Sequence, residues 1–219
     1  MRGCVLYDLD GTIVDTNELI IETFDHVFRN HCALVVERDD LIPQMGLPLE
    51  DQFRYFTGRS DVTELIAAYR TYNLTRHDEM VALFPNVLEV VQRFAAEGFV
   101  QGVVTTKMRA TTERALNMFG LSPYMKTIVT VEDVQHPKPH PEPVLKAMEL
   151  LGARPELTVM VGDSPFDMQS AKAAGAAAVA VAWSLKPEAV MRDAGADHVI
   201  ADMKDLYPIC GLGELRAER

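Results

Sequence analysis

The 219-residue sequence predicts an α/β fold, namely a doubly wound parallel sheet that is interrupted after its first strand by a helical insert. Two observations predict it. Short apolar runs of strand length alternate with helical stretches over residues 87–200, a pattern typical of a parallel sheet covered on both faces. Between residues 16 and about 80, helical patterns follow one another without a convincing strand. We therefore expect a core made of residues 1–15 and 82–219, and a helical part made of residues 16–81.

The first expected strand is the apolar run Cys4–Tyr7, which leads directly into two closely spaced acids. Asp15 and Thr16 are candidate N-caps for a helix that continues through Phe28. Further helices are expected near residues 49–56 and 61–75.

Beyond residue 85 the pattern becomes helix, strand, helix, strand. A helix over Val87–Ala96 is ended by Gly98 and precedes a second strand over residues 100–105. Later strands are expected at residues 127–131, 158–162, 177–182 and 198–200, each preceded by a helical stretch.

The composition is that of an ordinary globular protein, with 48% apolar and 24% charged residues. A net charge of −11 argues against a nucleic-acid or anionic membrane partner, because both would repel the protein. The first apolar run is too short for a secretory signal, so we expect a cytoplasmic protein. Cys4, Cys32 and Cys210 are widely spaced, which favours reduced thiols. The residues give no indication of the oligomeric state.

Reactive side chains gather at one edge of the expected sheet. Ligands of such sheets bind beyond the carboxyl ends of the strands, where the strand order reverses. Asp8 follows the first strand, Thr105 ends the second, Lys138 follows the third and Asp163 follows the fourth. Asp8 and Asp10 repel each other when both are charged, so this pair indicates a metal, a shared proton or a solvated turn.

Four motifs in this order carry a resemblance to a known family. They are Asp8-Leu9-Asp10-Gly11-Thr12, Thr105, Lys138-Pro139 and Gly162-Asp163-Ser164-Pro165-Phe166-Asp167. With them the chain resembles, over essentially its whole length, the haloacid dehalogenase superfamily of phosphotransferases. The resemblance implies a Rossmann-like core and a magnesium-dependent phosphohydrolase that acts through an aspartyl-phosphate intermediate.

The resemblance also implies roles for the catalytic residues. Asp8 would be the nucleophile, since a carboxylate can form a mixed anhydride with phosphate that water later hydrolyses. Asp10 would be the general acid and base. Thr105 and Lys138 would stabilise the charge of the transferring phosphoryl group.

Magnesium is the implied cofactor. Asp163 would bind it together with the Asp8 carboxylate and the backbone carbonyl of Asp10, because magnesium prefers a few hard oxygen ligands. Asp167 would support either the metal shell or Lys138; the alternative for Asp167 is an ordinary acid in the first turn of a helix.

In this family, an insert after the first motif is a cap that selects the substrate, so residues 16–81 would be a cap. The resemblance is closest to a group of bacterial inorganic pyrophosphatases, through residues 15–21, 77–79 and 104–107. Residues of the cap and of the segment after the second strand would then contact the substrate. The candidates are Asn17, Glu18, Gly46, Thr106, Lys107 and Arg109. Helix capping, a turn or exposed charge explains several of them equally well.

The expected substrate is pyrophosphate, and phosphoglycolate or another small phosphomonoester is the alternative. A dehalogenase would not normally need Asp163 or Asp10. A phosphonate hydrolase would need a lysine in the cap, and residues 16–81 contain none. We see no cap signature of a mutase. A non-catalytic regulatory protein of the same fold is a further alternative, disfavoured because every acid of the site is present.

Overall fold

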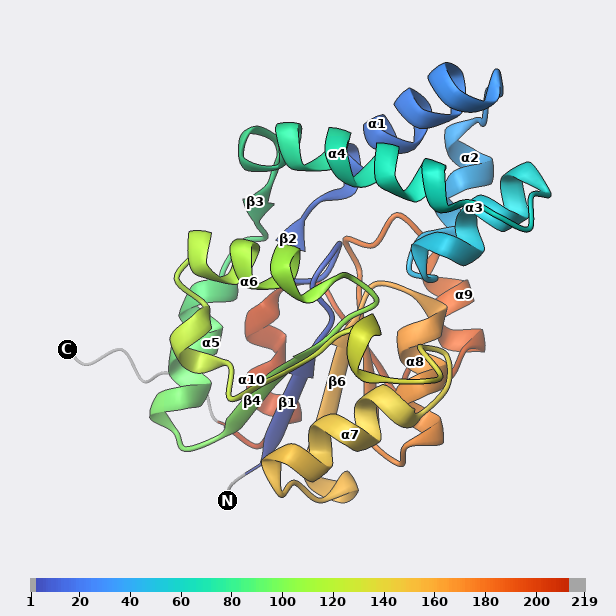
Figure 1. The fold of residues 1–219 in the computed structure, drawn as a ribbon. Coiled ribbons are helices and arrows are strands. Elements are labelled where there is room, and N and C mark those ends of the chain that lie inside the picture. Colours follow the sequence, from blue (N-terminus) through green and yellow to red (C-terminus); the bar gives the residue numbers. More distant parts are fainter. Residues whose placement is uncertain (1–2, 213–219) are drawn as a thin grey trace.

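A six-stranded parallel sheet forms the centre of the protein in a computed structural model that describes residues 3–212 (Figure 1). Its strand order is β5-β4-β1-β6-β7-β8. The strands are β1 (Cys4–Tyr7), β4 (Val100–Val104), β5 (Thr127–Val129), β6 (Thr158–Gly162), β7 (Ala177–Val181) and β8 (His198–Ile200). The chain builds outward from β1 first on one side and then on the other, so the predicted doubly wound α/β class is confirmed.

The central strand β1 shows why a short apolar run is buried here. It pairs in parallel with both β4 and β6, and Leu6 lies opposite Gly102 and Met160. Successive side chains of a strand point to opposite faces. Val5 and Tyr7 accordingly pack in one apolar cluster, and Leu6 packs in the other. A strand covered on both faces needs no polar side of its own.

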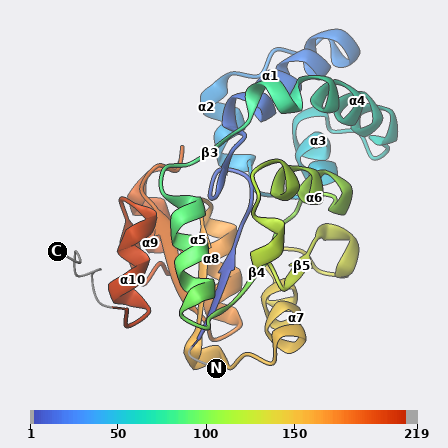
Figure 2. The same ribbon diagram turned by 90° about the vertical axis from the view of Figure 1, so that its left-hand side faces the viewer.

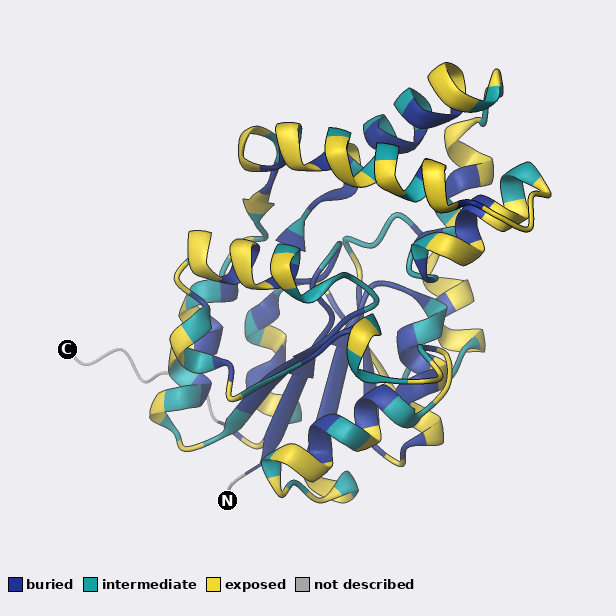
Figure 3. Cartoon of the chain, in the orientation of Figure 1, coloured by how far each residue is buried: buried dark blue, intermediate teal, exposed yellow. Residues whose placement is uncertain are grey.

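Helices cover both faces of the sheet. Residues of α5, α6 and α10 pack in one apolar cluster with the sheet, and residues of α7, α8 and α9 pack in the cluster on the other face. These helices are α5 (Val87–Ala96), α6 (Arg109–Met118), α7 (Glu142–Leu151), α8 (Pro165–Ala173), α9 (Glu188–Asp193) and α10 (Leu206–Ile209). Figure 3 shows the resulting buried sheet between helices whose outer sides are exposed.

A helical insert, defined here as residues 17–80, stands at one end of this core (Figure 2). Its helices are α1 (Asn17–Val27), α2 (Arg38–Leu41), α3 (Leu49–Thr57) and α4 (Thr63–Met80), with a π-helical turn at Phe28–Cys32. Residues 17–80 are all described and contain no strand, as predicted. The insert has its own apolar cluster, which includes Phe24, Phe28 and Phe53.

A two-stranded antiparallel ribbon joins the insert to the core and was not predicted. It consists of β2 (Val14–Asp15) and β3 (Ala82–Leu83), with Val14 opposite Leu83. Strands of two residues carry too little pattern to be recognised in the sequence. Both passages of the chain between core and insert therefore lie side by side.

Several element boundaries differ from the prediction by a few residues, and one expected cap is replaced by another. Helix α4 runs to Met80 rather than to residue 75. Strand β5 ends at Val129, because Thr130 and Asp133 cap a short 3₁₀ turn that follows. The side chain of Thr16 makes no capping hydrogen bond, whereas Asp15 Oδ1 accepts the N–H of Asn17 at 3.2 Å.

The three cysteines form no disulfide, and Cys4 is buried in β1. None of the helices within residues 3–212 has the length and apolar character needed to cross a membrane.

Candidate active site

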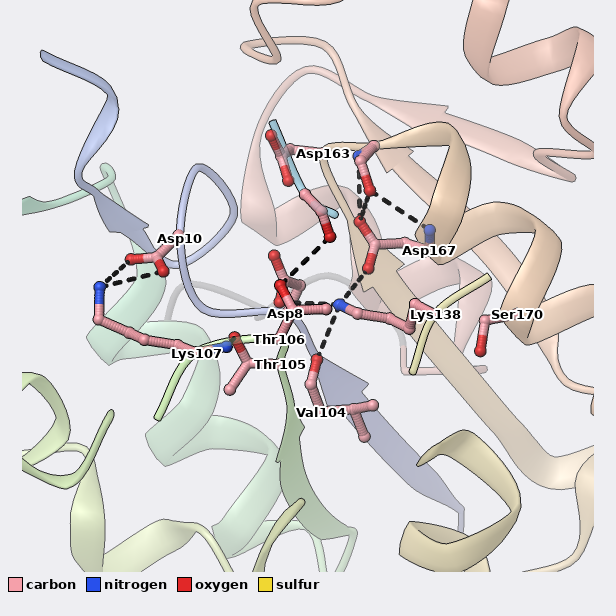
Figure 4. A network of polar contacts seen from close by, with 12 residues as sticks. Asp8, Asp10, Val104, Thr105, Thr106, Lys107, Lys138, Asp163, Asp167 and Ser170 are labelled. Carbon is pink, nitrogen blue, oxygen red and sulfur yellow. Dashed lines mark hydrogen bonds and ion pairs between the residues drawn. The ribbon is translucent and has the colours of Figure 1, made fainter. Parts of the chain in front are cut away.

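The carboxyl ends of β1, β4 and β6 bring Asp8, Thr105 and Asp163 together at one edge of the sheet (Figure 4). Lys138 reaches the same place from the segment between β5 and α7. The four side chains are buried, with between 2% and 7% of each residue exposed. The structure thus assembles the set of residues that the order of motifs predicted.

Lys138 connects residues at the ends of β1 and β4 with a residue of α8. Its Nζ donates to Asp8 Oδ1 at 2.9 Å, to the carbonyl of Val104 at 3.0 Å and to Asp167 Oδ1. An ammonium group has three donors, and all three are used. The ammonium therefore cannot turn away from Asp8 without leaving a buried acceptor unpaired.

Asp167 is held by its own helix as well as by Lys138. Its Oδ2 accepts from the N–H of Ser164 at 3.0 Å and from the hydroxyl of Ser164, which closes a capping box at the start of α8. Of the two predicted roles, the contacts of Asp167 are those of a partner for Lys138. Its carboxylate also lies close to those of Asp8 and Asp163.

Burial and mutual repulsion dominate the electrostatics of the two strand-end acids. Burial, together with Asp167 and Asp163, raises the pKa of Asp8 to about 8 in spite of Lys138. Burial likewise raises the pKa of Asp163 to about 6, against the opposing charge of Lys186, whose Nζ lies 3.8 Å from Asp163 Oδ2. Burial opposes the charge of Lys138, but Asp167 and Asp8 outweigh it and keep the pKa of Lys138 above its ordinary value.

A bound cation would stabilise the charged form of these buried acids. Asp8, Asp163 and Asp167 each offer one carboxylate oxygen, and these oxygens lie within 4.8 Å of one another. Hard oxygen donors in small number are suited to a divalent ion such as magnesium, which keeps water or substrate at its other positions. Since Asp167 is already engaged by Lys138 and Ser164, Asp8 and Asp163 are the carboxylates best placed to hold the ion.

Asp10 does not join this cluster through its side chain. Lys107 Nζ donates to both of its carboxylate oxygens, at 2.8 and 3.0 Å (Figure 4). Asp10, the predicted acid-base residue, and Lys107, a predicted substrate ligand, are therefore paired with each other in this structure.

Gly11 has a structural reason to be glycine. Its φ of +75° lies in the left-handed region, and a Cβ atom there would stand 2.6 Å from Asp163 Oδ2. Any side chain would both strain the backbone and displace the acid that follows β6. The turn after β1 thereby comes close to the end of β6.

A cavity of about 470 Å³ opens above these residues, between the core and the insert. Its floor includes Asp8, Asp10, Thr105 and Asp163. From the insert, the loop at Gly46 reaches down, and its carbonyl accepts from the hydroxyl of Thr106 at 3.2 Å.

The cavity separates the predicted substrate ligands into two groups. Four of the six line it, namely Asn17, Gly46, Thr106 and Lys107. Two do not: Glu18 is paired with Arg38 at 2.6 Å, and Arg109 is paired with Asp133 at 2.6 Å. Arg109 also donates to the carbonyl of Ile128 at 3.0 Å, so α6 places this side chain against the end of β5 and the segment that follows it.

Sequence reasoning missed the contribution of α4. Helix α4 lines the cavity with side chains spaced by three and four residues, which is one face of a helix. They are Ile66, Tyr69, Arg70, Asn73 and Leu74. The spacing is visible in the sequence, but the surface that this helix face meets is not.

Comparison with known protein families shows to which family this chain belongs. The chain belongs to the haloacid dehalogenase-like hydrolase family, whose model matches residues 5–181. It is a hydrolase of that family, and its acidic cluster at the strand ends is one that could hold a metal ion.

Two bacterial proteins and one solved structure are similar to this chain over nearly its whole length. The chain is 43% identical to "Pyrophosphatase PpaX" of Bacillus mycoides over 94% of this chain and 95% of the relative, and 42% identical to the protein of that name of Bacillus cereus strain AH820 over 94% of each. Among solved structures, a haloacid dehalogenase-like hydrolase from Bacteroides fragilis is 28% identical, with a TM-score of 0.82 over 93% of this chain and 99% of that one.

Proposed function

We propose that this protein is a magnesium-dependent phosphohydrolase that acts through an aspartyl-phosphate and hydrolyses inorganic pyrophosphate. The observation that carries the proposal is Asp8, which stands at the end of the central strand, on the floor of the cavity, and accepts from Lys138 at 2.9 Å. The relatives named as pyrophosphatases, which match along nearly their whole length, support the choice of substrate.

In the first step, a carboxylate oxygen of Asp8 attacks phosphorus in line, and the bond to the bridging oxygen breaks. The electron pair of that bond goes to the leaving phosphate, which Asp10 can protonate. Asp8 must be ionised to attack, so its raised pKa requires a compensating cation. Lys138 supplies one positive charge, and a magnesium ion held by Asp8 and Asp163 would supply a Lewis acid for the phosphoryl oxygens.

In the second step, water attacks the phosphorus of the aspartyl-phosphate. Asp10 takes a proton from this water, the acyl-phosphate bond breaks, and phosphate and the Asp8 carboxylate are released. Thr105 donates its hydroxyl to the phosphoryl oxygens in both steps.

The pairing of Asp10 with Lys107 gives substrate binding a further role. Both carboxylate oxygens of Asp10 accept from Lys107, so neither is free to contact the leaving group while this pair holds. An incoming phosphoryl group competes for Lys107 and frees Asp10. Lys107 and Asn17 contact the substrate in this proposal, and Gly46 and Thr106 close the loop of the insert over it.

A small phosphomonoester is the second candidate, and one observation favours it. Much of the upper cavity wall is apolar, with Ile20, Phe24 and Ile66 among its side chains. Pyrophosphate has no carbon to place against such a wall, whereas the leaving group of a phosphomonoester does.

Phosphate release in the presence of magnesium distinguishes the candidates. We expect kcat/KM for pyrophosphate to exceed that for phosphoglycolate and for a panel of sugar phosphates by about tenfold or more, which corresponds to about 1.4 kcal/mol of transition-state binding. A higher value for a phosphomonoester would reject pyrophosphate as the substrate and leave the catalytic residues in place.

A further inference from the structure

One cation on the wall of the active-site cavity has no partner. Arg70 lies on the cavity-lining face of α4, one turn from Ile66 and Asn73. Within residues 3–212, its guanidinium group forms no hydrogen bond or ion pair with the protein. It is exposed rather than buried, so its charge is available to a ligand.

The other basic groups near the cavity floor are already engaged. Lys107 is paired with Asp10, Lys138 is paired with Asp8 and Asp167, and Arg109 is turned away toward Asp133. The floor also carries several carboxylates. A substrate with a second negative charge therefore meets repulsion near the floor and an uncompensated positive charge at Arg70.

Arg70 also differs from most arginines of the insert. Acids outnumber arginines in residues 17–80, and the insert has no lysine. Four of its arginines pair with carboxylates, namely Arg29, Arg38, Arg54 and Arg76. Arg59 has no side-chain partner in the described structure either, but it does not line the cavity. Arg70 alone combines a free guanidinium group with a place on the wall.

We propose that Arg70 binds the negatively charged leaving group of the substrate, which is the second phosphoryl group when pyrophosphate is bound. The inference rests on the proposed phosphohydrolase function. A guanidinium group presents two parallel N–H donors that match the oxygens of a phosphate or carboxylate. With Asp8 below and Arg70 above, the bond that breaks lies between the catalytic floor and the insert. Arg70 is thus a specificity residue for substrates that carry two anionic groups.

The test compares a substrate that has a charged leaving group with one that lacks a second ionised group. Pyrophosphate and 4-nitrophenyl phosphate serve as this pair. We expect Arg70→Gln to lower kcat/KM for pyrophosphate about tenfold or more, mainly through KM, because the charge of the leaving group is present before and during the reaction. The value for 4-nitrophenyl phosphate stays within about twofold. Arg70→Lys, which keeps the charge but loses the paired donors, gives an intermediate loss.

Arg59→Gln is the matched control, since it removes an equally unpaired arginine of the insert outside the cavity. We expect it to leave both substrates unaffected. Equal losses on both substrates with Arg70→Gln, or no loss on either, would overturn the inference. Thermal unfolding of each variant shows whether the fold is retained.

A binding measurement separates this inference from the proposed function. In an Asp8→Asn background, titration calorimetry with pyrophosphate should show about tenfold weaker binding when Arg70→Gln is added. If the wild-type protein instead prefers phosphoglycolate, the pyrophosphate proposal fails, and the same comparison is made with phosphoglycolate, whose leaving group carries a carboxylate. Unchanged binding of the preferred substrate in the double variant would reject the role of Arg70.

Discussion

The core and the helical insert both enclose an apolar interior, but they differ in what else they bury. Within the described residues, the buried carboxylates and lysines all belong to the core, as with Asp8, Lys138 and Asp163. The interior of the insert is aromatic instead: Phe24 contacts Phe53 and Tyr69, with ring centroids 5.1 and 4.9 Å apart. Buried charge is unfavourable unless it is paired or has a use. The difference supports the proposal that the reaction takes place on residues of the core, while the insert contributes side chains to the cavity wall.

The insert is also attached in a way that suits a separate body. The β2–β3 ribbon joins it to the core, and the bidentate pair between Asp78 of α4 and Arg114 of α6 adds a contact, with distances of 2.8 and 2.6 Å. Its own aromatic cluster gives it an apolar interior separate from the two clusters of the core. In line with the proposed function, we expect this part of the chain to open and close over the cavity as a lid.

The largest effect is expected at Asp8, the proposed nucleophile. Asp8→Asn should lower kcat by at least about a thousandfold. The amide cannot form the aspartyl-phosphate, and it carries no negative charge to bind the cation. The fold should persist, since the change removes repulsion among buried acids. Phosphate release and thermal unfolding check both statements, with Asp193→Asn as an exposed control. Retention of wild-type activity would mean that the core does not carry the chemistry in this way.

The buried charges should also matter for stability. Lys138→Met leaves Asp8 and Asp167 buried without their cation, so we expect the free energy of unfolding to fall by about 3–5 kcal/mol. Lys172→Met removes an exposed pair with Asp197 and should change it by less than about 1 kcal/mol. Urea unfolding of both variants gives the comparison. Equal effects would show that burial does not distinguish these pairs.

The pH dependence tests the acids of the core. Asp8 and Asp163 have folded-state pKa values raised to about 8 and about 6, so without metal the folded state binds protons more tightly than the unfolded state. Their contribution to stability is fully present below about pH 4 and is lost as the pH rises through 6 and 8. A magnesium ion replaces these protons and should restore about 2.7 kcal/mol at a hundred times its Kd.

We therefore expect magnesium to raise the melting temperature more at pH 8 than at pH 5, where protons compete for the carboxylates. Asp163→Asn should lose most of this shift. A shift of the same size at both pH values, or in the variant, would place the ion elsewhere.

The smallest effect is expected where insert and core meet. Asp78 and Arg114 are about half exposed, and the pair lowers the pKa of Asp78 through the bonds from Arg114 and His77. A double-mutant cycle with Asp78→Asn and Arg114→Gln should therefore show the two changes to be nearly additive in their effect on the urea midpoint. A strongly non-additive result would instead mean that this contact holds the insert on the core more firmly than its exposure indicates.

The sequence by itself determined the fold class and which residues meet at the carboxyl ends of the strands. Asp8, Thr105 and Asp163 could be recognised because each directly follows an apolar strand, and parallel strands end at the same edge of their sheet. This information is local, so it can be read without knowing how the helices pack. The helical character of residues 17–80 was equally visible, because period and length are properties of the segment itself.

Only the tertiary structure decided which side chains face the substrate cavity. Lys107 meets Asp10 across 97 positions of sequence, Arg109 turns to Asp133, and Arg70 faces the cavity from a helix of another part. The β2–β3 ribbon, which joins the insert to the core, consists of strands too short to be recognised in the sequence. The direction of a helix face depends on how that helix packs against elements distant in the chain, and this packing is a sum of many weak contacts rather than a local signal.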